Sequence, residues 1–197
     1  MHHNFLPSRR AAWGLPLLAL LLIGTGLGAC SPPELARIPV QFTGGHETDP
    51  VDQGRPVILI AAALGVEPGV FREAFSKVEP APGGTAPSGQ RVHANKEVLM
   101  AALSPHGITN DRLDEVSDYY RYPPGEGKRW RVREAEAFAL VKKGQIIGFE
   151  ITDGGAGYTT PPTIGVSGFP SLRSAAQLAF GQDLETNGSI KGMIVAE

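Results

Sequence analysis

The feature that most constrains this chain is an apolar stretch near its start, Gly14 to Cys30, which reads GLPLLALLLIGTGLGAC. The residues before it include Arg9 and Arg10 and no acidic side chain. A basic head, an apolar run and an end made of small residues are the three parts of a secretory signal peptide. We therefore expect residues 1–29 to be a signal peptide, so that the folded protein lies beyond them.

The last four residues of the stretch are Leu27, Gly28, Ala29 and Cys30, and Cys30 is the only cysteine of the chain. They resemble the lipobox of bacterial lipoproteins, in which a branched aliphatic residue and two small residues precede a lipidated cysteine. The resemblance implies cleavage before Cys30, with acyl chains such as palmitate on its sulfur and its new amino group. More than one acyl chain anchors a protein stably without any helix that spans the membrane.

Two alternatives to a lipoprotein stay open at this point: an ordinary signal peptide, or a membrane helix that happens to end in cysteine. Pro16 and Gly24 weaken a permanent helix, and we favour the lipoprotein. The resemblance then implies a place in the cell envelope, on the periplasmic side of a membrane. In the sorting rule of such proteins an aspartate after the cysteine retains them on the inner membrane, so Ser31 favours the outer membrane.

Composition limits the function classes of the remaining chain. The removed part holds two of the 18 basic residues and none of the 20 acidic ones, which leaves 16 and 20 and a net charge of −4. Such a balance gives no case for nucleic acid as a partner. A single cysteine also excludes an internal disulfide, so packing alone must stabilise the fold.

Residues 30–43 are expected to form a lipidated tether. Pro32 and Pro33 stiffen such a segment. Beyond them Ile38, Val40 and Phe42 alternate with other residues, which indicates a short extended segment that docks on the body of the protein.

Apolar residues at helical spacing mark 44–122 as a helical module. Val57–Leu64 is apolar on every side, which favours a buried helix, and Pro68 opens a second helix. Gln90–Leu103 and a helix capped by Thr109 repeat the same order of helix, glycine, turn and helix. We expect two helical hairpins that pack as a four-helix unit.

The spacing of apolar residues changes to two in residues 134–197, which predicts a small antiparallel β module. Strands are expected at Phe138–Val141, Gln145–Thr152, Thr163–Val166, Ala175–Phe180 and Ser189–Val195. Lys142-Lys143-Gly144 is a hairpin turn between the first two of these strands. Gly144–Ile151 recurs as Gly188–Val195, which indicates one β-repeat and the first strand of another. The fold class is therefore α+β.

The loop from Gly44 to Pro56 carries four side chains that could ligate a metal ion: His46, Glu47, Asp49 and Asp52. It matches neither of two metal-binding patterns. A zincin helix needs a second histidine where Pro50 stands, and the oxygens of a helix–loop–helix calcium site are missing. We favour caps of turns and helices for these carboxylates over a metal or catalytic site.

The junction between the two modules is rich in aromatic residues, namely Tyr119, Tyr120, Tyr122 and Trp130, with basic residues around the tryptophan. Aromatic side chains among cations can stack on sugars or bases. We favour packing between the two modules for these four side chains, because aromatic side chains are mostly packing material.

Two further resemblances cover most of the remaining chain. Residues 154–164, GGAGYTTPPTI, look like a G-x-G-Y-x-x-x-P repeat of bacterial surface and tail-fibre-like proteins. The segments GHETDP at 45–50 and NDRLDEVS at 110–117 resemble a family of uncharacterised exported bacterial proteins. The first resemblance implies a β scaffold, and neither implies a catalytic residue.

The sequence therefore predicts a lipid-anchored envelope protein with a non-enzymatic binding or scaffold role. Its expected partners are the membrane, through the lipid, and an envelope protein or glycan; the lipid on Cys30 is the only group expected to be bound. The alternative is a metal-dependent, hydrolytic site on the 46–52 loop, with Asp111 or Asp114 contributing from the second hairpin.

Overall fold

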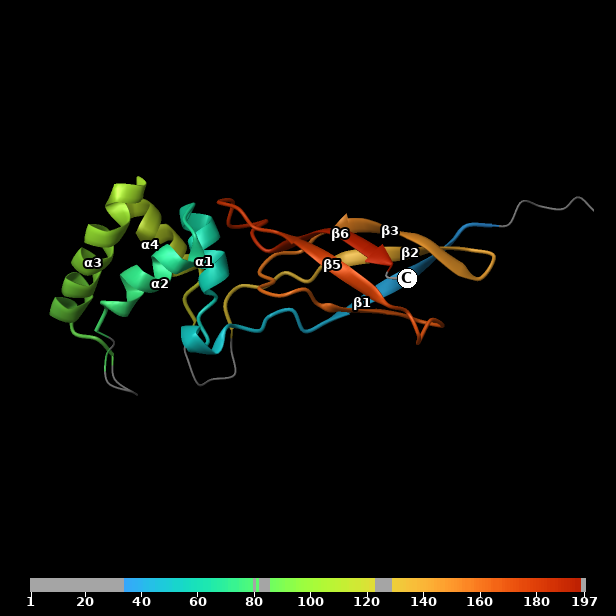
Figure 1. Cartoon of the computed structure of the whole chain (residues 1–197), viewed down its shortest axis with the longest axis horizontal. Coiled ribbons are helices and arrows are strands. Elements are labelled where there is room, and N and C mark those ends of the chain that lie inside the picture. Colours follow the sequence, from blue (N-terminus) through green and yellow to red (C-terminus); the bar gives the residue numbers. More distant parts are fainter. Residues whose placement is uncertain (1–33, 80, 82–85, 123–128, 196–197) are drawn as a thin grey trace, which may run out of the picture. The chain divides into compact units, whose positions relative to one another are not determined.

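A computed structural model describes residues 34–79, 81, 86–122 and 129–195 (Figure 1). Cys30 and the expected signal peptide lie outside these residues. Pro33–Glu197 forms one compact unit. In the part of the chain that is described, no helix is both long enough and apolar enough to cross a membrane.

Along the described chain, one strand comes first, the helices follow, and the other strands come last. The first strand is β1 (Ala36–Thr43), and it is followed by the short 3-10 helix η1 (Pro50–Asp52). The helices are α1 (Val57–Leu64), α2 (Pro68–Ser76), α3 (Gly89–Leu103), η2 (Ser104–His106) and α4 (Asn110–Tyr119). The remaining strands are β2 (Glu136–Lys142), β3 (Gln145–Asp153), β4 (Thr163–Val166), β5 (Ser174–Ala179) and β6 (Ser189–Val195). The expected α+β class with antiparallel sheets is confirmed.

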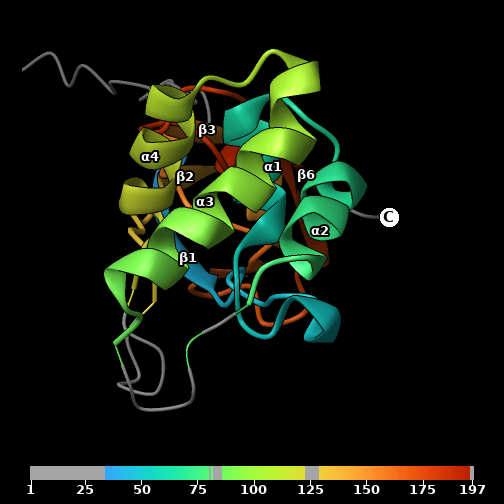
Figure 2. The same ribbon diagram turned by 90° about the vertical axis from the view of Figure 1, so that its left-hand side faces the viewer.

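The helices begin and end where local chemistry directs them. Gly65 ends α1 in the left-handed conformation, as its lack of a Cβ allows. Ser88 and Thr109 cap α3 and α4 with their side-chain oxygens. Helix α1 packs against α2 and α4, and α2 packs against α3. Figure 2 faces α3, with α2 on one side of it and α4 on the other. These helices bury a first core around Leu59, Leu103 and Val116.

The strands form two antiparallel sheets that close on each other. One has the order β3-β2-β1-β4 and the other pairs β5 with β6. Strand β6 also lies near β3, and β5 lies near β4, so both edges of the small sheet adjoin edges of the large one. The six strands surround a second core that contains Tyr158, Ile164 and Ile190.

Strand β1 is the extended segment expected to dock within residues 30–43, and it shortens the tether predicted there. Residues 36–39 pair with β2, and residues 40–43 pair with β4. Pro39 is the last residue paired with β2, at the point where β1 changes partner. Its missing N–H therefore disturbs the sheet little, although a proline within a run normally argues against a strand. The segment between Cys30 and the first strand is thereby shortened to Ser31–Leu35.

The internal repeat is visible in the strand registers. In the β2–β3 hairpin the register shifts after the pair Leu140 and Gly148, and in the β5–β6 hairpin it shifts after the pair Gln177 and Gly192. The two glycines lie 44 positions apart, whereas their partners lie 37 positions apart. The second hairpin therefore has the same bulge as the first and a turn that is seven residues longer.

Candidate functional site

The His46 side chain contacts the segment that follows β3. Its side chain is 6% exposed, and its ring stacks on that of Tyr158 with the centroids 4.9 Å apart. Nδ1 lies 3.3 Å from the carbonyl oxygen of Gly157, to which it must donate. Nε2 lies 3.7 Å from a carboxylate oxygen of Glu134. The imidazole is thus held by the glycine-rich segment that follows β3.

The carboxylate of Glu47 turns back to its own loop. It accepts a hydrogen bond from the backbone N–H of Gly45 at 3.1 Å and another from the hydroxyl of Thr160. The Thr160 hydroxyl, together with backbone N–H groups, lowers the pKa of Glu47 below its usual value. These hydrogen bonds favour the ionised form of the carboxylate.

The two aspartates of the loop have different partners from Glu47. Asp49 caps η1 by accepting from the backbone N–H of Val51 at 3.0 Å, as expected for a turn cap. The carboxylate of Asp52 is 5% exposed and accepts two hydrogen bonds from the guanidinium of Arg72, at 2.7 and 2.8 Å. Arg72 lies in α2 and was not predicted from the sequence as a partner of Asp52. Arg55, which follows Asp52 more closely in the chain, lies over the ring of Phe75.

The four predicted ligands therefore do not converge on one point. Within residues 34–79, 81, 86–122 and 129–195, no group of three or more His, Cys, Asp or Glu side chains is arranged to hold a metal ion. The two aspartates of the second hairpin lie elsewhere: Asp111 is in the first turn of α4, and Asp114 pairs with Lys96 of α3 at 2.6 Å.

The loop that contains His46 and Glu47 is hydrogen-bonded to the glycine-rich segment after β3. The backbone N–H of Thr159 donates to the carbonyl oxygen of Gly45 at 2.8 Å. The hydroxyl of Thr159 donates to the carbonyl oxygen of Glu47 at 2.7 Å. Gly157 has a φ of +86°, and a Cβ there would lie 2.6 Å from the carbonyl oxygen of Arg131. The GGHE and GGAGYTT segments are thus hydrogen-bonded to each other, although more than one hundred positions separate them in the chain.

Tyr158 lies between the loop and the strands, although no site role was predicted for it from the sequence. Its side chain is fully buried, and its hydroxyl donates to the carboxylate of Glu134 at 2.9 Å. The same oxygen accepts from the backbone N–H of Ala135 at 3.1 Å. Burial raises the pKa of Tyr158 to about 12. The phenol is therefore neutral and acts as a structural donor.

Three of the four junction aromatics form hydrogen bonds, and two of these three, Tyr120 and Trp130, are buried. Trp130 is buried, and its indole N–H donates to the carbonyl oxygen of Gly157 at 2.9 Å. Tyr120 is buried too, and burial raises its pKa to about 12. Tyr122 donates to the carbonyl oxygen of Gly54. Tyr119 is partly exposed, but Arg131 lies over its ring. These rings pack between helices and strands and form no open stacking platform.

Asn187 joins the turn between β5 and β6 to the helical core, although this turn carried no signal of such a role. It is 1% exposed, and its amide donates to the carbonyl oxygen of Leu59 at 2.7 Å and to the hydroxyl of Tyr120 at 2.8 Å. Its side-chain oxygen accepts from the backbone N–H of Gly181 at 3.1 Å. The longer turn of the second hairpin thus reaches the helices.

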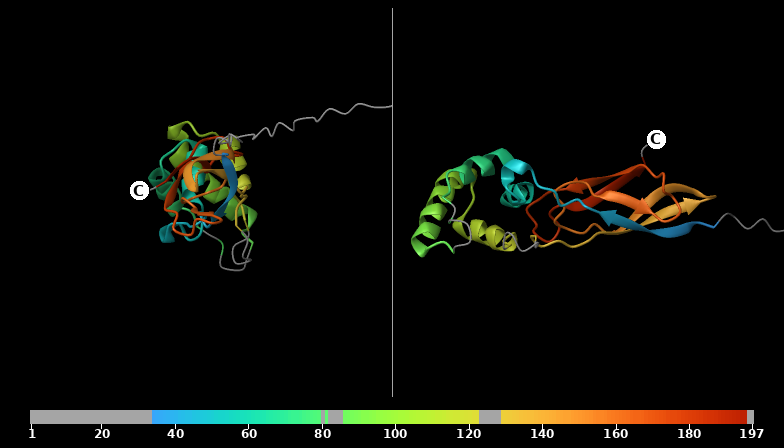
Figure 3. Two further views of the ribbon diagram at one scale, coloured as in Figure 1. Left: turned by 90° about the vertical axis from the view of Figure 1, so that its right-hand side faces the viewer. Right: turned by 90° about the horizontal axis from the view of Figure 1, so that it is seen from below.

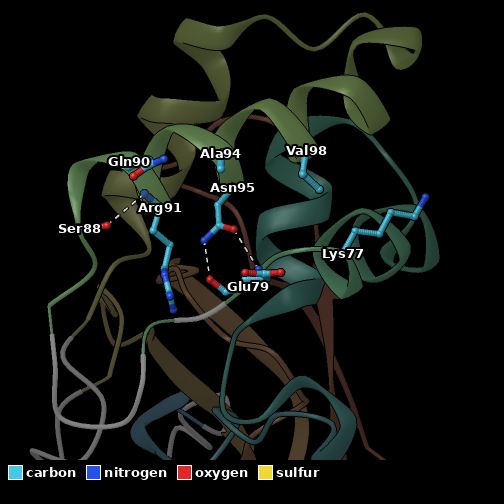
Figure 4. Close-up of a pocket in the computed structure, with 8 residues that line it drawn as sticks. All are labelled: Lys77, Glu79, Ser88, Gln90, Arg91, Ala94, Asn95 and Val98. Atoms are coloured by element: carbon cyan, nitrogen blue, oxygen red, sulfur yellow. Dashed lines mark hydrogen bonds between the residues drawn. The ribbon is translucent and has the colours of Figure 1, made fainter.

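The surface has several hollows. One of about 650 Å³ is lined mainly by apolar side chains of α1 and α2 and by Phe180, which is 40% exposed. Another, of about 340 Å³, lies beside the start of α3 (Figure 4). In it the side chain of Asn95 bonds both the backbone N–H and the carbonyl oxygen of Glu79, at 2.9 and 2.7 Å. That asparagine ties the segment after α2 to α3.

Comparison with known proteins adds no family. No protein-family model matches the chain, and no curated protein or solved structure matches it at a significant level.

Proposed function

We propose that this protein is a lipid-anchored component of the cell envelope with a non-enzymatic binding or scaffold role. The observation that carries the proposal is the position of Cys30, the only cysteine. It stands at the end of an apolar stretch, after two small residues, and six positions before the first residue of β1. A lipid on this thiol would tether a folded body whose first strand begins a few residues later.

The contacts of the 46–52 loop support a structural part for its polar side chains. His46 binds the glycine-rich segment, Asp49 caps η1, and Asp52 holds Arg72. We do not propose a metal-dependent or hydrolytic function on this loop, because His46 contacts the glycine-rich segment whereas both aspartates pair with Arg72. Glycan binding through Trp130 is not proposed either, since its ring is buried and its N–H is used.

The contacts between helices and strands support the scaffold role. Asn187 bonds to α1 and to Tyr120, and Trp130 belongs to the helical core while it donates to the glycine-rich segment. Arg112 of α4 donates to the carbonyl oxygens of Ala63 and Gln182. Buried polar groups that are all satisfied hold parts of a protein in one arrangement. A body of this kind can present a fixed surface to another envelope component.

Metabolic labelling tests the anchor. The full-length gene is expressed in bacteria that are fed radiolabelled palmitate, beside Cys30→Ala and the control Ser31→Ala. We expect label on the wild type and on Ser31→Ala, and none on Cys30→Ala. Equal label on the wild type and Cys30→Ala would reject the proposal.

A further inference from the structure

Basic and apolar side chains gather at the end of the sheets where β1 begins. Ala36 pairs with Val141, so Leu35 lies beside Lys142 at the start of the β2–β3 turn. Leu35 is 49% exposed, and Ile147, three residues after this turn, is 58% exposed. Figures 1 and 3 show the β2–β3 turn and the start of β1 at the same end of the strands, away from the helices.

Among the described residues, three exposed cations lie at this end of the strands. Lys142 and Lys143 are exposed in the β2–β3 turn, and Arg173 is exposed just before β5. Strand β4 runs antiparallel to β1, so the turn that joins β4 to β5 lies toward the same end. None of these three cations forms an ion pair with another described residue, and Glu34 is the acidic side chain next to Leu35. We name Leu35, Lys142, Lys143, Ile147 and Arg173 the tether-end surface.

Lys143 stands where the backbone favours another residue. Lys142 pairs with Gln145, so the loop has two residues, Lys143 and Gly144, with φ of 51° and 75°. Positive φ at both positions is a type I′ turn, which favours Asn-Gly. Glycine follows this preference at the second position, and lysine departs from it at the first. Residues that depart from a local preference in this way are typical of functional or strained sites.

The length of chain before β1 indicates what lies near this end. Only Ser31–Leu35 separate Cys30 from β1, and this span reaches at most about 20 Å. A lipid on Cys30 would therefore keep the tether-end surface close to the bilayer. This step rests on the proposed anchor.

We propose that the tether-end surface binds the anionic phospholipid headgroups of the membrane that holds the anchor, so that the helices face away from it. Charge complementarity and the short connection both favour this occupant over a protein. Each lysine or arginine near an anionic membrane strengthens binding about fivefold. Three cations are weak alone, but they are enough to orient a body that a lipid already holds at high local concentration.

The test uses residues 30–197, because Pro33–Glu197 is a compact unit with its own cores. The only cysteine allows coupling through Cys30 to a maleimide lipid in vesicles of phosphatidylcholine and phosphatidylglycerol. Tryptophan is introduced as Ile147→Trp or, as the matched control in exposed α4, as Asp111→Trp. Brominated lipids quench the fluorescence of a tryptophan that they touch. The native Trp130 is buried and gives the same background in both variants.

We expect quenching of Ile147→Trp, none of Asp111→Trp, and a fall in quenching when phosphatidylglycerol is replaced by phosphatidylcholine. Lys143→Asn keeps a favourable turn, and unattached Cys30→Ser chains with this change should bind anionic vesicles about fivefold more weakly. Equal quenching at the two positions, or quenching that ignores the lipid charge, would overturn the proposal. The synthetic attachment makes these results independent of whether cells lipidate Cys30, so the failure of the anchor and the failure of this surface are distinguished.

Discussion

Asn187 donates its side-chain amide to the carbonyl oxygen of Leu59, 2.7 Å away, although 128 positions separate the two residues. Leu59 lies in the helical core, whereas Asn187 ends the turn of the second hairpin. The equivalent turn of the first hairpin is seven residues shorter. The longer turn of the second copy thus contributes hydrogen bonds that hold the helices.

Replacing Asn187 should loosen this joint. Asn187→Ala removes the side-chain donor from two buried groups, the carbonyl oxygen of Leu59 and the hydroxyl of Tyr120. We expect a loss of about 3 kcal/mol in the free energy of unfolding, measured by urea denaturation. Asn110→Ala, at an exposed position, is the control and should change stability by less than about 0.5 kcal/mol. Equal losses in the two variants would refute the role of Asn187.

Two glycines near the same turn should respond very differently to alanine. Gly188 has a φ of +73°, and a Cβ there would lie 2.4 Å from the carbonyl oxygen of Tyr158 and 2.6 Å from a methyl carbon of Leu59. We expect Gly188→Ala to cost about 3 kcal/mol or more. A Cβ at Gly181 meets nothing within 4 Å, so Gly181→Ala should be neutral in the same denaturation experiment. A tolerated Gly188→Ala would contradict the close approach of the two segments.

Alkaline pH should destabilise the protein through two buried phenols. Burial raises the pKa of Tyr120 and of Tyr158 from 10 to about 12, so folding favours their protonated forms. That stability is complete below pH 10 and is lost as the pH rises from 10 through about 12. The variants Tyr120→Phe and Tyr158→Phe should each lose less stability across this range than Tyr122→Phe. The free energy of unfolding at a series of pH values decides this, and parallel curves for all three would count against it.

Acid should act through Glu47. Its pKa is lowered from the usual 4.5, mainly by the hydroxyl of Thr160, so the folded state binds this proton less readily than the unfolded state. The stability that the carboxylate provides is present above pH 4.5 and is lost as the pH falls through the lower, folded value. Glu47→Gln should therefore flatten the acid limb of the stability curve, and Thr160→Val should reproduce most of the change. If the acid limb were unaltered in Glu47→Gln, the hydrogen bond between Glu47 and Thr160 would not contribute to the pH dependence of stability.

Local signals predicted most of the helices and strands. The run of apolar residues and the glycine after it predicted α1 at its observed bounds, and Thr109 caps α4 as its position indicated. Alternation predicted the β2–β3 hairpin and β4, and the internal echo anticipated β6. These features depend on neighbours in the sequence, which a single sequence displays.

Features that depend on distant partners were beyond the sequence. Alternation predicted an extended segment within residues 30–43, but the sequence does not show that β1 pairs first with β2 and then with β4. The 46–52 loop resembled a cluster of metal ligands in the sequence. In the structure Arg72 binds the carboxylate of Asp52, and Thr160 binds that of Glu47. Asn187 carried no signal except that the second copy of the repeat has a longer turn.

The most direct test of the account is the mass of the amino-terminal peptide of the protein recovered from membranes. The account predicts a peptide that begins at Cys30 and carries a diacylglyceryl group on sulfur and an acyl chain on its amino group. A mature chain that begins at any other residue, with the Cys30 thiol unmodified, would contradict it.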